Sequence, residues 1–262
     1  MHAAVLGSPV GHSLSPVLHT AAYHALGLDG WIYTAHECTE DGLAAFVDGL
    51  DRSWAGLSLT MPLKRVALDV ATEVSPLAAA VGAANTLVLG GRRYADNTDV
   101  AGIVGALGPV RGRAVVLGAG GTAQAVLAAL RDLGIDQVDV LVRDLARAGE
   151  LRATAERLGV ESAIHAALAD PAAFVDGADV VISTLPKGAA DHVVCRGAGT
   201  VLDVVYAPWP TRFAAQAAGA RVVSGMDMLL HQAAVQVELM TGRPGPLEAM
   251  RAALDAAVAA RA

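Results

Sequence analysis

The feature that most constrains the fold is the pattern Gly118-x-Gly120-x-x-Ala123. It follows an apolar run at 113–117 that is typical of a buried strand, and it opens a helix-like segment at 122–133. Glycines allow close backbone approach to a pyrophosphate, and a helix N-terminus offers free N–H groups and partial positive charge. A tight structural turn is the alternative. In this strand–loop–helix context we expect a dinucleotide to bind at Gly118, Ala119, Gly120, Gly121 and Thr122.

The second half of the chain alternates between strand-like and helix-like segments. Such alternation predicts a parallel sheet with right-handed crossovers, as in doubly wound α/β folds. The residue content agrees, because 54% of residues are hydrophobic and only 4% are aromatic, which favours helices packed on parallel strands over a β-sandwich. The expected strands are 113–117, 138–142, 162–165, 180–183, 201–204 and 221–224, and the helices are 122–133 and 144–158.

The first half is also mixed α/β. A helix from Pro16 to about Leu26 is expected, with Ser15 as its N-cap. Gly90-Gly91 separates two short strand-like runs and predicts a hairpin. The expected strands are 3–7, 31–35, 55–59, 86–89 and 92–95, and the further expected helices are 40–50 and 66–81 with a break at Ser75-Pro76. Two closing helices are expected at the C-terminal end, at 232–240 and 246–260.

Charge and residue content exclude several classes of protein. The formal net charge of −7 argues against nucleic-acid binding, which normally needs a basic face. No apolar run reaches the roughly 18 residues of a membrane-spanning helix, and the N-terminus lacks the basic region of a signal peptide, so a cytoplasmic location is expected. Cys38 and Cys195 lie far apart outside any CxxC pattern, which indicates ordinary thiols and no metal site.

Four polar clusters stand at expected strand ends or turns. Each alone has an ordinary structural explanation: a serine as helix cap, Asn85 as a turn residue, Asp99 as a cap, Lys64 as a solvated charge. Lys64 and Lys187 are the two lysines among 19 basic residues, and a lysine kept in an arginine-rich chain can do what arginine cannot. The clusters are Gly11-His-Ser13-Leu-Ser15-Pro16, Thr60-Met-Pro-Leu-Lys64, Ala84-Asn85-Thr86 and Asn97-Thr98-Asp99.

Taken together, these clusters strongly resemble the shikimate dehydrogenase family. The C-terminal half agrees with the resemblance in order and spacing, which therefore covers essentially the whole chain. It carries the glycine loop, Asp203-Val-Val-Tyr206-x-Pro208-x-x-Thr211, and Gly225-Met-Asp-Met228-Leu-Leu-His-Gln232.

The resemblance implies reversible NADPH-dependent reduction of 3-dehydroshikimate to shikimate, a step of aromatic amino-acid biosynthesis. It also implies two domains: a substrate-binding domain at 1–100, joined by C-terminal helices at 237–262, and a Rossmann-type NADP-binding domain at 101–236. Reducing a ketone needs hydride on carbon and a proton on oxygen. Lys64 is the expected proton donor, because lysine can lose its proton whereas arginine does not, and Asp99 is expected to orient it.

The expected binding residues follow from the same resemblance. Ser13, Ser15 and Tyr206 are expected to hold the substrate carboxylate. Thr60, Asn85 and Gln232 are expected to bind ring hydroxyls together with Asp99. Gly225 and Met228 are expected to contact the cofactor.

Arginines after the second strand of the nucleotide domain favour NADP. Arg143 and Arg147 suit a 2′-phosphate, because the guanidinium fork donates two charge-assisted hydrogen bonds. Asp144 next door is the kind of residue that binds the ribose of NAD, and Asp139 lies near the same spacing inside the strand. The family often has Asn-Arg-Thr here, whereas this chain has Val142-Arg143-Asp144.

Two alternatives stay open at this point. One is a quinate/shikimate dehydrogenase paralogue that uses NAD. The other is a non-catalytic dinucleotide-binding sensor, against which the presence of both Lys64 and Asp99 argues. The expected partners are small molecules, and the chain is expected to be a monomer or a homodimer.

Overall fold

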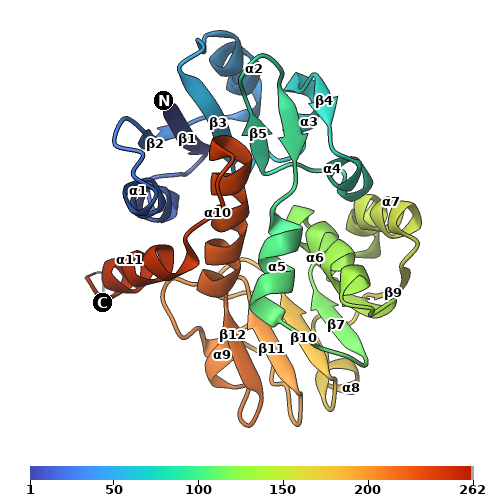
Figure 1. Cartoon of the computed structure of the whole chain (residues 1–262). Helices are drawn as coiled ribbons and strands as arrows, with labels where there is room; N and C mark the ends of the chain where they lie inside the picture. The colour runs from blue at the N-terminus through green and yellow to red at the C-terminus, as the bar shows by residue number, and fades with distance from the viewer. Residues whose placement is uncertain (261–262) are drawn as a thin grey trace. The chain divides into compact units, whose positions relative to one another are not determined.

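The computed structural model describes residues 1–260 and divides them into two compact units (Figure 1). Unit 1 is Met1–Asp99 with the segment that begins at Leu229, and unit 2 is Val100–Met228. The sequence had placed 229–236 with the nucleotide domain, but the structure puts these residues in unit 1. Arg261 and Ala262, the last residues of the expected C-terminal segment, lie outside the described residues.

Unit 1 is built on a mixed six-stranded sheet in the order β2-β1-β3-β5-β6-β4. β1 runs parallel to β2 and β3, whereas β5 runs antiparallel to β3 and β6. The strands are β1 (His2–Gly7), β2 (Ile32–Glu37), β3 (Trp54–Leu59), β4 (Glu73–Val74), β5 (Thr86–Val88) and β6 (Tyr94–Asp96), and the helices are α1 (Ser15–Ala25), α2 (Glu40–Asp48), α3 (Ala67–Val70), α4 (Pro76–Val81) and α11 (Leu247–Ala259). The expected hairpin around Gly90-Gly91 is confirmed.

Both faces of the unit 1 sheet are buried, and β1 shows how one strand serves both. Ala4 and Leu6 pack on the side of α2, whereas Ala3 and Val5 pack with Tyr23 of α1. Alternate residues of a strand point to opposite faces, so a strand covered on both sides is apolar throughout. Continuous apolar runs therefore located β1 and β3 well.

Unit 2 is an all-parallel six-stranded sheet in the order β12-β11-β10-β7-β8-β9. This is the Rossmann strand order, with a switch point between β7 and β10, and it confirms the predicted doubly wound fold. The strands are β7 (Ala114–Leu117), β8 (Gln137–Leu141), β9 (Glu161–His165), β10 (Val180–Ser183), β11 (Thr200–Asp203) and β12 (Arg221–Ser224), and the helices are α6 (Gly121–Asp132), α7 (Gly149–Leu158), α8 (Ala172–Val175) and α9 (Arg212–Ala215). Two helices cross the division between the units, α5 (Asp99–Leu107) and α10 (Gly225–Thr241).

Three local predictions were wrong. Ser15 is the first residue of α1 and not its N-cap, which is Leu14 without a side-chain bond. The expected helix at 66–81 does break at Ser75-Pro76 as predicted, but the part before the break is the short helix α3 followed by strand β4. The expected helix at 144–158 begins with the 3-10 turn Leu145–Ala148, which the Asp144 carboxylate caps by accepting a bond from the Ala146 N–H at 2.9 Å.

Two further observations concern the whole chain. Among the described residues, no helix combines the length and apolar character needed to cross a membrane. Cys38 and Cys195 are buried free thiols. Burial raises the pKa of the Cys195 thiol to about 12, so this cysteine stays protonated and unreactive.

Candidate functional site

The catalytic pair expected from the sequence is formed within unit 1. Lys64 Nζ donates to Asp99 Oδ2 at 2.6 Å, and the two side chains are only 21% and 6% exposed. Lys64 stands in the loop after β3, and Asp99 is the first residue of α5. Lys64 is thus an ion-pair partner instead of a fully solvated charge, and the Asp99 carboxylate bonds to the side chains of Lys64 and Asn85.

Asn85 joins this pair to the helix α10. Its Nδ2 donates to Asp99 Oδ1 at 2.9 Å and to Gln232 Oε1 at 3.3 Å. Asn85, Asp99 and Gln232 are all buried. Four residues predicted to act together, from four separate segments of the chain, therefore form one hydrogen-bonded cluster: Lys64, Asn85, Asp99 and Gln232.

The remaining unit 1 residues lie at the carboxyl ends of two neighbouring strands. The loop after β1 carries Ser13, Ser15 opens the helix α1 that follows it, and Thr60 directly follows β3. Parallel neighbouring strands end at the same edge of a sheet, and β1 and β3 are such a pair. The Ser15 N–H donates to Ser13 Oγ at 3.2 Å, and the N–H of Leu59, just before Thr60, donates to the Asn85 carbonyl at 2.7 Å.

The glycine loop of unit 2 lines a pocket of about 270 Å³ at the switch point between β7 and β10. Gly118 has a φ of +106°, and a Cβ there would lie 2.7 Å from Thr184 Oγ1, so glycine is required. At Gly120 and Gly121 an added Cβ would meet open space. Gly121 and Thr122 open α6, whose N-terminus has no side-chain cap. The turn leaves room and backbone donors for a phosphate.

The two arginines expected to read a 2′-phosphate line the same pocket. Arg143 and Arg147 lie there together with Asp144, but the lining does not include Asp139. Asp139 bonds instead to His165 Nε2 at 2.8 Å, across the neighbouring strand. One oxygen of Asp144 is occupied in capping the Leu145–Ala148 turn. Asp139 therefore gives no support to the NAD alternative, whereas Asp144 does lie in the pocket.

A second pocket of about 520 Å³ adjoins the first and contains residues that are not among the expected site residues. The two pockets share Arg143, Leu168, Leu185 and Pro186. Lys187, one of the two lysines of the chain, lines the second pocket with His192. The signal was available, because Lys187 follows β10 at the switch point, where ligands of such sheets bind.

Tyr206, Gly225 and Met228 also belong to unit 2. Tyr206 lies in the loop after β11, which is tied at both ends by Asp203: its Oδ1 accepts from the Val205 N–H at 3.2 Å and its Oδ2 from Thr211 Oγ1 at 2.7 Å. Burial raises the pKa of the Asp203 carboxyl. An added Cβ at Gly225 would collide with the Val204 carbonyl oxygen, so this position requires glycine, and Met228 is buried in α10.

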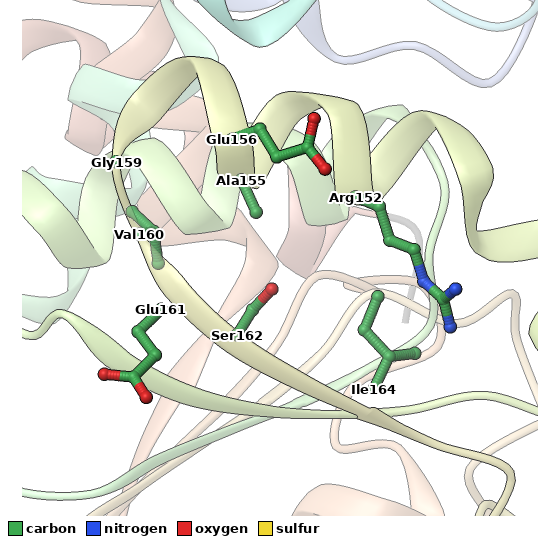
Figure 2. A pocket seen from close by; sticks show the side chains of 8 residues that line it. All are labelled: Arg152, Ala155, Glu156, Gly159, Val160, Glu161, Ser162 and Ile164. Atoms are coloured by element: carbon green, nitrogen blue, oxygen red, sulfur yellow. The ribbon is translucent and has the colours of Figure 1, made fainter.

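Another hollow in unit 2, shown in Figure 2, contains none of the predicted site residues. The charged side chains in it have opposite signs, and they come from α7 and β9. Its lining is Arg152, Ala155, Glu156, Gly159, Val160, Glu161, Ser162 and Ile164.

Comparisons with known proteins identify the family. Residues 5–87 match the family model for the shikimate dehydrogenase substrate binding domain, residues 108–198 match shikimate / quinate 5-dehydrogenase, and residues 225–254 match the shikimate 5′-dehydrogenase C-terminal domain. A Halorubrum lacusprofundi protein named shikimate dehydrogenase (NADP(+)) is 39% identical over 275 residues, which covers 96% of this chain and 97% of that protein. The chain belongs to the shikimate dehydrogenase family. The resemblance inferred from the polar clusters is confirmed.

Solved structures of shikimate dehydrogenases share the fold. The Mycobacterium tuberculosis enzyme superimposes with a TM-score of 0.90 at 46% identity, covering 98% of this chain and 99% of that one. The Thermus thermophilus enzyme, solved in complex with NADP(H) and shikimate, has a TM-score of 0.84 at 34% identity, with coverage of 98% and 99%.

Proposed function

We propose that this chain is a shikimate dehydrogenase that reversibly reduces 3-dehydroshikimate to shikimate with NADPH, in aromatic amino-acid biosynthesis. The observation that carries the proposal is the partly buried Lys64–Asp99 pair in a chain of this family, with Asn85 bonded to Asp99 and to Gln232. A sensor that only bound a dinucleotide would have no need of this lysine–carboxylate pair.

Lys64 supplies the proton in this proposal. When bound, NADPH supplies the hydride to the carbonyl carbon, and the carbonyl oxygen gains a proton. The Lys64 ammonium donates that proton as the carbonyl group becomes an alcohol, and in the reverse direction the Lys64 amine takes the proton from the hydroxyl. Asp99 holds the ammonium in place through the 2.6 Å bond.

The substrate presents one carboxylate and several hydroxyls, and the assigned residues match those groups. Ser13, Ser15 and Tyr206 hold the carboxylate. The other polar residues bind ring hydroxyls; they are Thr60, Asn85, Asp99 and Gln232. A site that pairs hydroxyls rejects analogues lacking them, because buried polar groups would lose their partners.

NADP fits the pocket of unit 2. The open space at Gly120 and Gly121 and the uncapped start of α6 suit the pyrophosphate, with Gly118, Ala119 and Thr122 completing the turn. Arg143 and Arg147 hold the 2′-phosphate, and Gly225 and Met228 contact the cofactor. Unit 1 then serves as the substrate-binding part and unit 2 as the nucleotide-binding part, of a cytoplasmic monomer or homodimer.

The test is a spectrophotometric assay of nicotinamide reduction with shikimate and quinate, each against NADP and NAD. We expect the highest kcat/KM for shikimate with NADP. A higher kcat/KM for quinate with NAD would identify the paralogue instead. Absence of shikimate-dependent reduction with both cofactors would contradict the proposal and favour a sensor.

A further inference from the structure

We infer that Gln236 is a positioning residue that orients a buried chain of hydrogen bonds toward the Asp99 carboxylate. Gln236 stands on α10, one helical turn after Gln232, and is 1% exposed. It touches neither Lys64 nor Asp99, and it acts through Thr86 and Asn85. The inference rests on the proposed function, because the role of Asp99 is taken from it.

The direction of the hydrogen bonds is set by backbone groups that cannot reverse. The Thr98 N–H donates to Asn85 Oδ1 at 2.8 Å, so the amide nitrogen of Asn85 must face Asp99. Thr86 Oγ1 lies 2.9 Å from the same Asn85 oxygen, which can only accept, so the Thr86 hydroxyl donates there. That leaves the Thr86 oxygen as an acceptor.

Gln236 supplies the donor that Thr86 requires. Its Nε2 donates to Thr86 Oγ1 at 3.0 Å and to the Asn85 carbonyl oxygen at 3.2 Å. Because a carbonyl oxygen only accepts, the amide of Gln236 is fixed in one orientation. Its Oε1 therefore faces the other side, where it accepts from Ser58 Oγ at 2.7 Å.

The series of hydrogen bonds begins at the Tyr33 hydroxyl. Since Ser58 donates to Gln236, the Tyr33 hydroxyl donates to Ser58 Oγ, at 2.6 Å. Every hydrogen bond in the series then has its donor on the Tyr33 side, and the last acceptor is the negatively charged carboxylate of Asp99. The order is Tyr33, Ser58, Gln236, Thr86, Asn85 and Asp99.

This alignment is chemically useful to the Lys64–Asp99 pair. Aligned hydrogen bonds polarise one another, and a buried carboxylate is stabilised by donors that point at it. An amide is suited to the middle of the chain, because it accepts on one side and donates twice on the other. His19 Nε2 lies 3.3 Å from Gln236 Oε1 and adds a second partner on the accepting side.

The test compares two substitutions at Gln236 with a neighbour on the same helix. Gln236→Met keeps the length but removes donor and acceptor, and Gln236→Glu keeps the acceptor but replaces the two N–H donors of the amide by a carboxyl group with at most one O–H donor. We expect each to lower kcat for shikimate oxidation about tenfold, with KM for shikimate changed less than about threefold, because the substrate contacts remain. Val237→Ala, a fully buried neighbour, is expected to lower Tm but leave kcat unchanged.

A second variant keeps the test decisive where the Gln236 variants do not fold. Thr86→Val preserves the shape of the side chain and breaks the chain at its next link, so it is expected to show the same fall in kcat. The inference is overturned by a folded Gln236→Met protein with wild-type kcat, by a change confined to KM, or by an equal fall in kcat for Val237→Ala. Inactive wild-type protein would instead contradict the proposed function.

Discussion

His19 shows how burial decides the state of a single residue. It is fully buried and its ring is stacked on Tyr33 at 4.0 Å between centroids. Burial lowers the pKa of His19 to about 3, against a smaller opposing effect of the bond to Gln236. Its Nδ1 has no hydrogen-bond partner within residues 1–260. His19 is thus neutral at ordinary pH and is unsuited to serve as the proton donor.

This lowered pKa predicts how stability depends on pH. Between about pH 6.5 and pH 3 the imidazole of His19 is protonated in the unfolded chain but stays neutral in the folded chain. Folding stability from this group is therefore complete above pH 6.5 and is lost as pH falls, by about 1.4 kcal/mol per pH unit. His19→Phe should remove this dependence. Urea unfolding of both proteins between about pH 7 and pH 5 measures it, and parallel curves would contradict the prediction.

Arg143 carries the prediction about cofactor choice. It lines both pockets next to the glycine loop, so its loss should affect a 2′-phosphate more than the rest of the nucleotide. Arg143→Ala is expected to weaken NADP binding at least about tenfold more than NAD binding, since it removes charge-assisted bonds. Fluorescence titration with both cofactors measures this.

Arg152 offers a matched control, because it is an arginine of the same unit that lines the separate hollow on α7 and β9. Arg152→Ala should leave the binding of both cofactors unchanged. Equal weakening of NADP and NAD by Arg143→Ala would mean that this arginine does not read the 2′-phosphate.

At the scale of elements, the loop from β11 to α9 is held by one aspartate and one threonine. Thr211 donates to Asp203 and also accepts from the Ala214 N–H at 3.1 Å, as the N-cap of α9. The hydrogen bond from the Thr211 hydroxyl also partly offsets the free-energy cost of burying the Asp203 carboxylate. The loop between these residues carries Tyr206, which the proposed function assigns to the substrate carboxylate, so we expect its anchoring to affect substrate binding.

Thr211→Ala is expected to destabilise the protein by about 1 kcal/mol, the usual cost of losing a helix cap, and to raise KM for shikimate with little change in kcat. Thr211→Ser keeps the hydroxyl and should restore both properties. Denaturant unfolding and steady-state kinetics measure the two effects. An unchanged KM in Thr211→Ala would show that the anchor does not matter for the substrate.

Most helices and strands could be predicted because buried elements leave a recognisable pattern of apolar residues in the sequence. Buried parallel strands such as β7 and β10 are continuous apolar runs, and the glycine loop marks the turn into α6. The N-cap of α1 was predicted wrongly, because a serine before proline is typical of an N-cap. The backbone is already helical at Leu14, so Ser15 lies inside the helix. Helical periodicity could not resolve β4, whose two residues pair with β6 only in the folded sheet.

For the molecule as a whole, the sequence indicated the two kinds of domain better than the residues at which they begin and end. The boundary after Met228 falls inside α10, which runs unbroken from Gly225 to Thr241. No break in composition marks such a point, because the division depends on long-range packing. The helix pattern did contain a missed signal: residues four apart lie on one face, so a second glutamine after Gln232 indicated Gln236.

Lys64→Ala tests whether the Lys64–Asp99 cluster carries out proton transfer in shikimate oxidation. The measurement is kcat of wild type and variant for shikimate-dependent NADP reduction, with the Kd of shikimate determined by calorimetry. We predict that kcat falls about a hundredfold or more while Kd changes much less, because the lysine acts mainly in the transition state. A folded Lys64→Ala protein with near-normal kcat would contradict the claim.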